Sequence, residues 1–153
     1  MDIDLSEPSL IDSQGRSKVH WWIVFEKGHC RHWWTRLFDA EMRHCWAVRQ
    51  DGKHFIAFQP YLGITTIDIL PISDPRDIAP EATAVLSVQA WAHADRIRDL
   101  VPACFNCVEQ VKALLGIRAW GVVTPRQLMN YCITQPHIAA TFTTIGGSDG
   151  RYT

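Results

Sequence analysis

Cys107 is the residue of this sequence with the strongest case for chemistry. It follows Asn106, a preferred helix N-cap, and Glu109 stands three residues after that cap, where its side chain can bond back. In the first turn of a helix, free N–H groups and the positive end of the helix dipole stabilise a thiolate. The same N–H groups can hold an oxyanion. This position therefore predicts a nucleophilic cysteine.

A cysteine nucleophile needs a base, and His44 is the best candidate. It lies in the predicted strand 42–49, where alternation places Met42, His44 and Trp46 on one face. Gln59 lies on the strand that returns from the next turn. Its amide is expected to bond to the far ring nitrogen of the histidine and to fix the tautomer, which is the third role of a catalytic triad.

The elements around these residues predict an α+β domain. Runs rich in β-branched and aromatic residues predict antiparallel strands, and an Asp-Gly pair at 51–52 predicts a hairpin turn. The predicted strands cover residues 18–25, 42–49, 54–59, 64–70 and 83–91, and residues 119–123 are considered as a further short strand. The fold class is therefore α+β, with an antiparallel sheet of four or five strands. The capped helix 106–115 packs on this sheet, and a second capping box begins at Thr124.

Residue usage divides the chain into three parts. Residues 1–17 show no clear period and are predicted to form an N-terminal arm. Residues 18–133 form the α+β domain. From residue 134 the pattern fades into small and polar residues, so residues 134–153 are expected to be a C-terminal tail that is flexible or ordered by a partner.

Three segments give the chain a family resemblance: RHCWAV at 43–48, FIAFQP at 55–60 and FNCVEQVKALLGI at 105–117. They resemble the circularly permuted papain-like fold of NlpC-type peptidases and lecithin–retinol acyltransferase-like proteins, and in particular small proteins encoded by tailed bacteriophages and prophages. In that group a histidine strand comes first, a polar residue follows on the next strand, and a cysteine opens a later helix. The resemblance implies that His44, Gln59 and Cys107 form the catalytic set. The third position in such proteins is often charged or an imidazole, and here it is a glutamine.

The cysteine spacing leaves a metal site as an alternative. Cys104 and Cys107 have CxxC spacing, and with Cys30 and His32 they would supply a tetrahedral zinc set. There is no second CxxC pair, so zinc is the weaker interpretation and no cofactor is expected. If Cys104 and Cys107 couple instead, Cys104 would act as a resolving thiol.

Two tryptophan pairs predict a contact surface. Neighbours in an extended chain point to opposite faces, so Trp21, Trp22, Trp33 and Trp34 are not all expected to point inward. Aromatic residues are enriched in the cores of protein interfaces. Core packing and interface use are both open for these four residues. In the second case they would bind neighbouring proteins of a virion, together with the tail 134–153.

The composition excludes several classes of function. The 153 residues, 47% hydrophobic and 20% charged, are those of one globular domain. A net charge of -1 argues against a nucleic-acid surface held mainly by charge. No apolar run reaches the roughly 20 residues that span a bilayer, and no signal peptide is recognised at the start. The chain is expected in the host cytoplasm or inside an assembled phage particle.

Two functions follow from these observations. The leading one is a cysteine hydrolase, a peptidase or amidase, in which His44 deprotonates Cys107 and the thiolate attacks an amide or ester carbonyl. The phage resemblance implies a cell-wall peptide as substrate. The alternative is a non-catalytic tail or head–tail component that uses the same scaffold for assembly.

Overall fold

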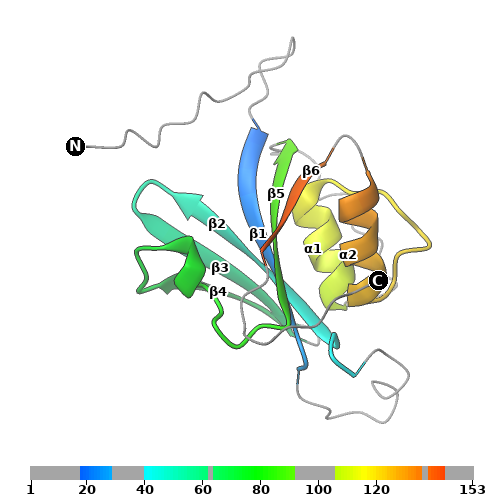
Figure 1. The fold of residues 1–153 in the computed structure, drawn as a ribbon, viewed down its shortest axis with the longest axis horizontal. Helices are drawn as coiled ribbons and strands as arrows, with labels where there is room; N and C mark the ends of the chain where they lie inside the picture. The colour runs from blue at the N-terminus through cyan, green and yellow to red at the C-terminus, as the bar shows by residue number, and fades with distance from the viewer. Residues whose placement is uncertain (1–17, 29–39, 62–63, 92–105, 136–137, 144–153) are drawn as a thin grey trace.

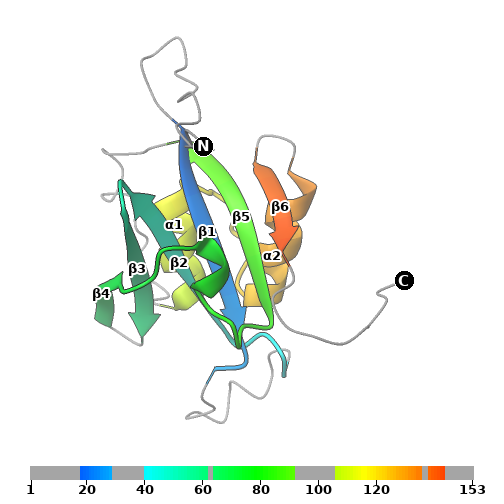
Figure 2. The same cartoon turned by 60° about the vertical axis from the view of Figure 1, so that its left-hand side comes forward.

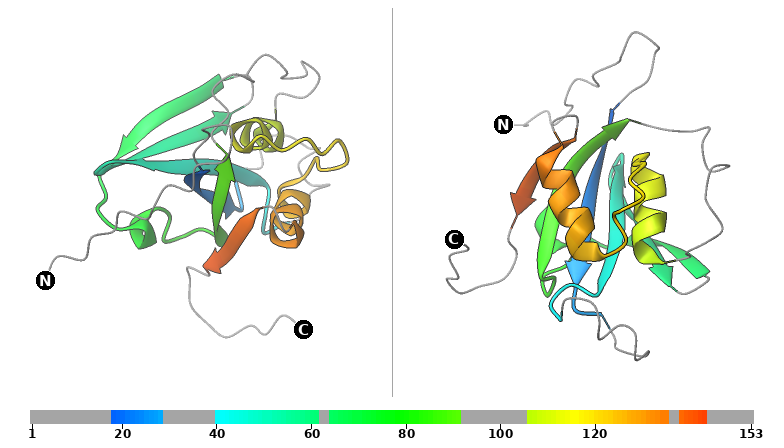
Figure 3. Two further views of the ribbon diagram at one scale, coloured as in Figure 1. Left: turned by 90° about the horizontal axis from the view of Figure 1, so that it is seen from above. Right: turned by 90° about the vertical axis from the view of Figure 1, so that its right-hand side faces the viewer.

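The computed structural model describes residues 18–28, 40–61, 64–91, 106–135 and 138–143, and confirms the α+β class (Figure 1). Six antiparallel strands form one sheet in the order β4-β3-β2-β1-β5-β6. The strands are β1 (Lys18–Glu26), β2 (His44–Asp51), β3 (His54–Tyr61), β4 (Ile64–Leu70), β5 (Ala84–Trp91) and β6 (Ala139–Thr143). Two helices, α1 (Cys107–Leu115) and α2 (Pro125–Thr134), lie against one face of the sheet (Figure 3).

The sheet is covered on both faces, which gives the molecule two layers of core. On the helix side, alternate residues of β1, such as Ile23 and Phe25, pack with the apolar faces of α1 and α2. On the other side, Val24 and its neighbours are covered by Ile78 and Ala82 from the segment between β4 and β5. That segment carries a short 3-10 helix, which crosses in front of the sheet in Figure 2.

This double cover corrects the expectation for the first tryptophan pair. Trp21 and Trp22 do point to opposite faces, but they are only 6% and 7% exposed because each face has its own cover. Both are therefore core residues of this chain, and the predicted partner surface does not include them. Trp33 and Trp34 lie outside the described residues.

Two further elements differ from the sequence prediction. Residues 139–143, which were expected to belong to the tail, form β6 and pair with β5. Thr141, Phe142 and Thr143 are residue types that favour strands, but the run is too short to decide the structure alone, and pairing with β5 completes the strand. Residues 119–123 form a turn and not a strand. The N-terminal arm and the segments 29–39 and 92–105 lie outside the described residues.

At one edge of the sheet, β4 exposes apolar side chains. Ile64, Ile67 and Ile69 are each about two-thirds exposed, at 66%, 65% and 67%. The strand pairs with β3 over its full length, from Tyr61–Ile64 to Phe55–Leu70. Ile67 and Ile69 lie on one face of the strand and Ile64 on the other, so β4 exposes apolar side chains on both of its faces.

Candidate active site

The first turn of α1 has the Asn106 cap that the sequence predicts, but the Glu109 carboxylate accepts from Lys112 Nζ at 2.6 Å instead of bonding back to the cap. The side-chain oxygen of Asn106 accepts a hydrogen bond from the Glu109 N–H at 2.9 Å, and Cys107 is the first helical residue. The helix ends at Gly116, whose φ of 67° is the left-handed conformation that glycine adopts without strain. The cap takes the third N–H of the helix, and the geometry of an α-helix gives the N–H groups of Cys107 and Val108 no acceptor within the helix.

Cys107 lies against the first residues of β2. Its sulfur is in hydrogen-bond contact with the thiol and the backbone N–H of Cys45 and with the His44 ring. The Cys45 thiol has the largest effect, and the His44 hydrogen bond and positive charge add to it. Burial opposes them, and the net result lowers the pKa of Cys107 to about 5, from an ordinary value of 9.0. The structure therefore brings the predicted nucleophile and the predicted base together.

The two neighbouring thiols behave in the opposite way. Burial raises the pKa of Cys45 well above 9.0, and the contact with Cys107 raises it further. Burial raises the pKa of Cys132, on α2, to about 12. Among these three cysteines, only Cys107 has a lowered pKa, which favours the thiolate at neutral pH and makes it the candidate nucleophile.

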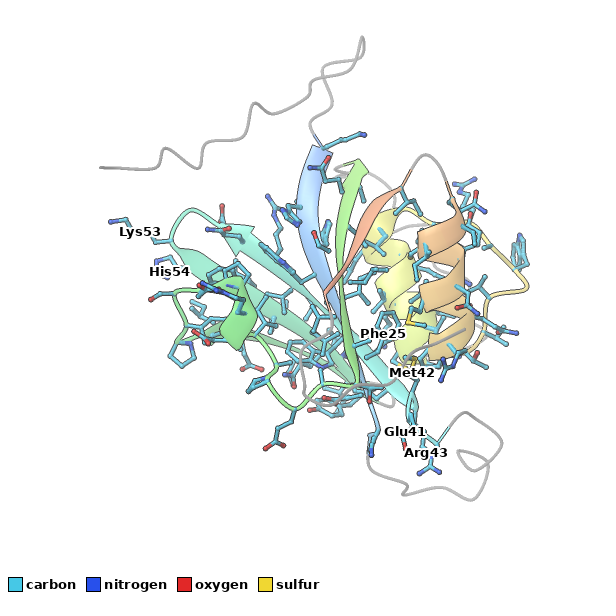
Figure 4. All side chains as sticks on the ribbon, viewed as in Figure 1. Phe25, Glu41, Met42, Arg43, Lys53 and His54 are labelled. Atoms are coloured by element: carbon cyan, nitrogen blue, oxygen red, sulfur yellow. The ribbon has the colours of Figure 1, made fainter. Side chains whose placement is uncertain are left out.

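An irregular start to β2 explains how two adjacent residues reach one sulfur. Along the ladder His44 stands opposite Glu26, but the Arg43 N–H bonds the Glu26 carbonyl at 3.0 Å, one residue out of register. Such bulge-like offsets re-aim side chains. Met42 consequently joins the helix-side core, in contrast to Trp46, so the expectation that both share a face is wrong. Alternation holds only within the regular strand, which begins at His44. In Figure 4 Met42 lies beside Phe25 near the helices.

Gly28 allows the chain to pass close to the histidine. Its φ is 61°, and a Cβ added there would lie 3.0 Å from the Cβ of His44. Any other residue would be strained in this backbone conformation and would press on the histidine. The glycine therefore helps to position the base.

The β2–β3 ladder stops where the start of α1 contacts β2, which leaves an opening in the backbone pairing. Paired residues of β2 and β3 end at Ala47–Phe58, and continuing this register places Pro60 opposite Cys45. Proline has no N–H to donate to a ladder, which weakens pairing at this point. On the far side of the opening, the Thr65 hydroxyl donates to the Gln110 side chain and ties α1 to β4.

Gln59 is linked to His44 through Tyr61. Its side-chain oxygen accepts a hydrogen bond from the Tyr61 hydroxyl at 2.9 Å. The Tyr61 ring stacks on the His44 ring, with centroids 5.9 Å apart and planes inclined by 18°. In this arrangement Tyr61 touches the base and Gln59 holds Tyr61.

Sequence reasoning missed two members of this site, Cys45 and Tyr61. Strict alternation placed Cys45 on the face away from the histidine, and only the irregular start of β2 joins the two. Tyr61 carried a usable signal, since it follows Gln59 by two residues on the same strand and therefore shares its face.

The zinc alternative falls mostly outside the described residues. This is true of Cys30, His32 and Cys104, and of the four proposed ligands only Cys107 is described. Within the described ranges, no group of three or more His, Cys, Asp or Glu side chains is arranged to hold a metal ion.

Comparison of the chain with protein-family models, with curated proteins and with solved structures gives no match. In the part of the chain that the structure describes, no helix is long and apolar enough to cross a membrane. The geometry and electrostatics around Cys107 are therefore the features that point to a function.

Proposed function

We propose that this chain is a cysteine hydrolase that acts on amide or ester bonds. One observation carries the proposal: a cysteine at the capped start of α1 has its pKa lowered to about 5 by contacts with Cys45 and His44. A thiolate beside a histidine at a helix N-terminus is the arrangement that nucleophilic acyl transfer requires.

The residues support each step of such a reaction. The Cys107 thiolate attacks the carbonyl carbon, and the N–H groups of Cys107 and Val108 stabilise the oxyanion. His44 gives its proton to the leaving amine or alcohol, and the acyl group stays on sulfur. His44 then accepts a proton from water, which attacks the thioester and releases the acid and the thiolate. The stacked Tyr61 ring holds the imidazole during these transfers.

The substrate proposal is a peptide of the bacterial cell wall. It rests on the resemblance of segments 43–48, 55–60 and 105–117 to permuted papain-like proteins of tailed phages. On the same basis we propose that the protein acts from the host cytoplasm or from an assembled virion.

A small activated ester tests the chemistry without knowledge of the substrate. p-Nitrophenyl acetate should release nitrophenol in a burst and leave one acetyl group on Cys107, detected by peptide mass spectrometry. Cys107→Ser should abolish the burst, and His44→Ala should slow it by roughly 10²- to 10⁴-fold. The exposed His54 of the β2–β3 turn offers the matched control, His54→Ala, which should retain the wild-type rate. An acetylation rate that is the same in all four proteins would refute the hydrolase proposal. If the burst depends on Cys107 and His44, muropeptides are the substrates to test next.

The exposed side chains favour assembly as a second candidate function. Ile64, Ile67 and Ile69 on β4 and Trp120, which is 81% exposed, are large apolar side chains on the described surface that a partner protein would cover. A tail or head–tail component would bind neighbours through such residues. Co-assembly with virion proteins that is lost in Ile67→Lys but kept in Cys107→Ser would favour this alternative.

A further inference from the structure

The buried thiol of Cys45 is a nucleophilic group that hydrolysis does not consume. It lies on β2, 0% exposed, with its sulfur in contact with that of Cys107 on α1. Cys132 lies near enough to Cys45 to raise the pKa of that thiol electrostatically. Cys45 and Cys107 are 62 positions apart in the sequence, so only the fold brings them into contact.

The two sulfurs differ in chemical state. Contacts to Cys107 favour its thiolate, while burial keeps Cys45 a protonated thiol. A thiolate is the form that reacts with peroxides, and a sulfenic acid condenses with a neighbouring thiol. Cys107 is a half-buried thiolate and Cys45 is a buried thiol, so the pair is arranged for oxidation of Cys107 first and condensation with Cys45 second.

We propose that Cys107 and Cys45 form a reversible disulfide when the protein meets a hydroperoxide, with Cys45 as the resolving cysteine. The Cys107 thiolate attacks one peroxide oxygen: an S–O bond forms, the O–O bond breaks, and the other oxygen leaves as hydroxide and takes a proton from His44. The sulfur loses two electrons and the peroxide gains them. The Cys45 sulfur then attacks Cys107, an S–S bond forms, the S–O bond breaks, and the hydroxyl leaves with the Cys45 proton as water.

This oxidation needs the thiolate but not turnover, so it stands apart from the hydrolase proposal. Bond formation requires the sulfurs to move from contact to about 2.05 Å. The disulfide would remove the nucleophile and protect it from irreversible oxidation to sulfinic acid. A dithiol reductant would restore the thiolate.

Tryptic peptides of the full chain distinguish the cysteine pairings. Cleavage after Arg and Lys places Cys45 in the peptide 44–49, Cys104 and Cys107 together in 99–112, Cys132 in 127–151 and Cys30 in 28–31. The probe is hydrogen peroxide in slight excess over protein, followed by alkylation of the remaining thiols, digestion without reductant and mass spectrometry. Further cleavage after Phe105 separates Cys104 from Cys107.

The expected result is a cross-link between peptide 44–49 and the Cys107 half of 99–112, which disappears on treatment with dithiothreitol. Cys104→Ser and Cys132→Ser should keep the cross-link. Cys45→Ser and Cys45→Ala should lose it. Above pH 9.0, where Cys107 is ionised even without the Cys45 contact, they should accumulate sulfinic acid on Cys107 instead. Circular dichroism that matches the wild type shows that these variants are folded.

Three results would overturn the proposal. The first is a disulfide within peptide 99–112, which would make Cys104 the resolving thiol. The second is a cross-link from Cys107 to peptide 127–151. The third is sulfinic acid on wild-type Cys107 at the same rate as in Cys45→Ala above pH 9.0, where Cys107 is ionised in both proteins.

Discussion

At the residue scale, the ionisation of Cys107 depends on three donors whose removal has separate effects. The Cys45 thiol, the His44 ring and the Cys45 N–H all favour the thiolate, and burial alone disfavours it. The backbone donor survives any side-chain substitution. Each side-chain contribution can therefore be measured through the pH at which the cysteine begins to react.

As the pH is raised, the rate of Cys107 alkylation by iodoacetamide should reach half its maximum near pH 5. It should reach its plateau well below pH 9.0. The sign follows from the contacts: a lowered pKa means that the reactive thiolate persists to lower pH. Cys45→Ala removes the largest cause, so the midpoint should move toward 9.0, and His44→Ala should move it in the same direction. Cys132→Ala is the matched control and should leave the midpoint unchanged. A wild-type midpoint near 9.0 would contradict the assignment.

Substitutions of Tyr61 and of Gln59 should differ in their effect on the burst rate, because Tyr61 contacts His44 and Gln59 contacts Tyr61. Tyr61→Phe keeps the stacked ring and loses the bond to Gln59, so the burst rate with p-nitrophenyl acetate should stay close to that of the wild type. Tyr61→Ala removes the stacking and should slow the burst. Gln59→Ala should resemble Tyr61→Phe. If the burst is slower in Gln59→Ala than in Tyr61→Ala, the glutamine acts on His44 directly, as its place on the return strand predicts.

At the scale of elements, the site lies where three irregularities coincide. The chain after β1 turns at Gly28, β2 starts one residue out of register at Arg43, and the β2–β3 ladder stops before Pro60. Each frees backbone or side-chain groups that a regular sheet would occupy. The capped start of α1 is directed into this opening, so helix and sheet each supply half of the site.

Two glycines with matching backbone conformations test the turn after β1. Gly28 and Gly52 have φ values of 61° and 58°, so an alanine at either position should cost about 1 kcal/mol of stability. Only Gly28 has the His44 Cβ beside it; Gly52 has nothing within 4 Å. Gly28→Ala should therefore also reduce the rate at which Cys107 is acetylated, whereas Gly52→Ala should not. Chemical denaturation and the ester burst measure the two effects, and equal burst rates would remove Gly28 from the site.

At the scale of the whole molecule, a buried lysine holds the two helices in place. Lys112 is 4% exposed, and its Nζ donates to Glu109 at 2.6 Å and to the carbonyls of Ala119 and Val122 at 2.8 and 2.9 Å. These carbonyls belong to the connection between α1 and α2. The lysine thus fixes the connection that brings α2, and Cys132 with it, against the sheet.

Lys112→Met should lower the free energy of unfolding by roughly 3 kcal/mol, because it leaves buried carbonyls without a donor while the apolar stem remains. Urea denaturation measures the change. The control is Lys27→Met, which breaks the exposed pair with Glu41 and should change stability by less than about 1 kcal/mol. Similar losses in both variants would show that the buried contacts of Lys112 add nothing.

The sequence by itself determined the local features. Asn106 and Thr124 begin helices because their side chains accept the N–H of the third helical residue, and this needs no tertiary contact. The five predicted strands and the hairpin at residues 51–52 follow from patterns within a few residues. Cys107 at a helix start and His44 at a strand start were found in the same way.

Only the tertiary structure decided which groups surround the nucleophile. Cys45 reaches Cys107 because β2 starts out of register, Tyr61 reaches His44 because β3 returns beside β2, and Trp21 and Trp22 are both buried because each face of the sheet is covered. The strand β6 forms because β5 offers it a ladder. These outcomes depend on contacts between distant segments, whose free energies are not encoded in the alternation or capping signals of any single stretch of sequence.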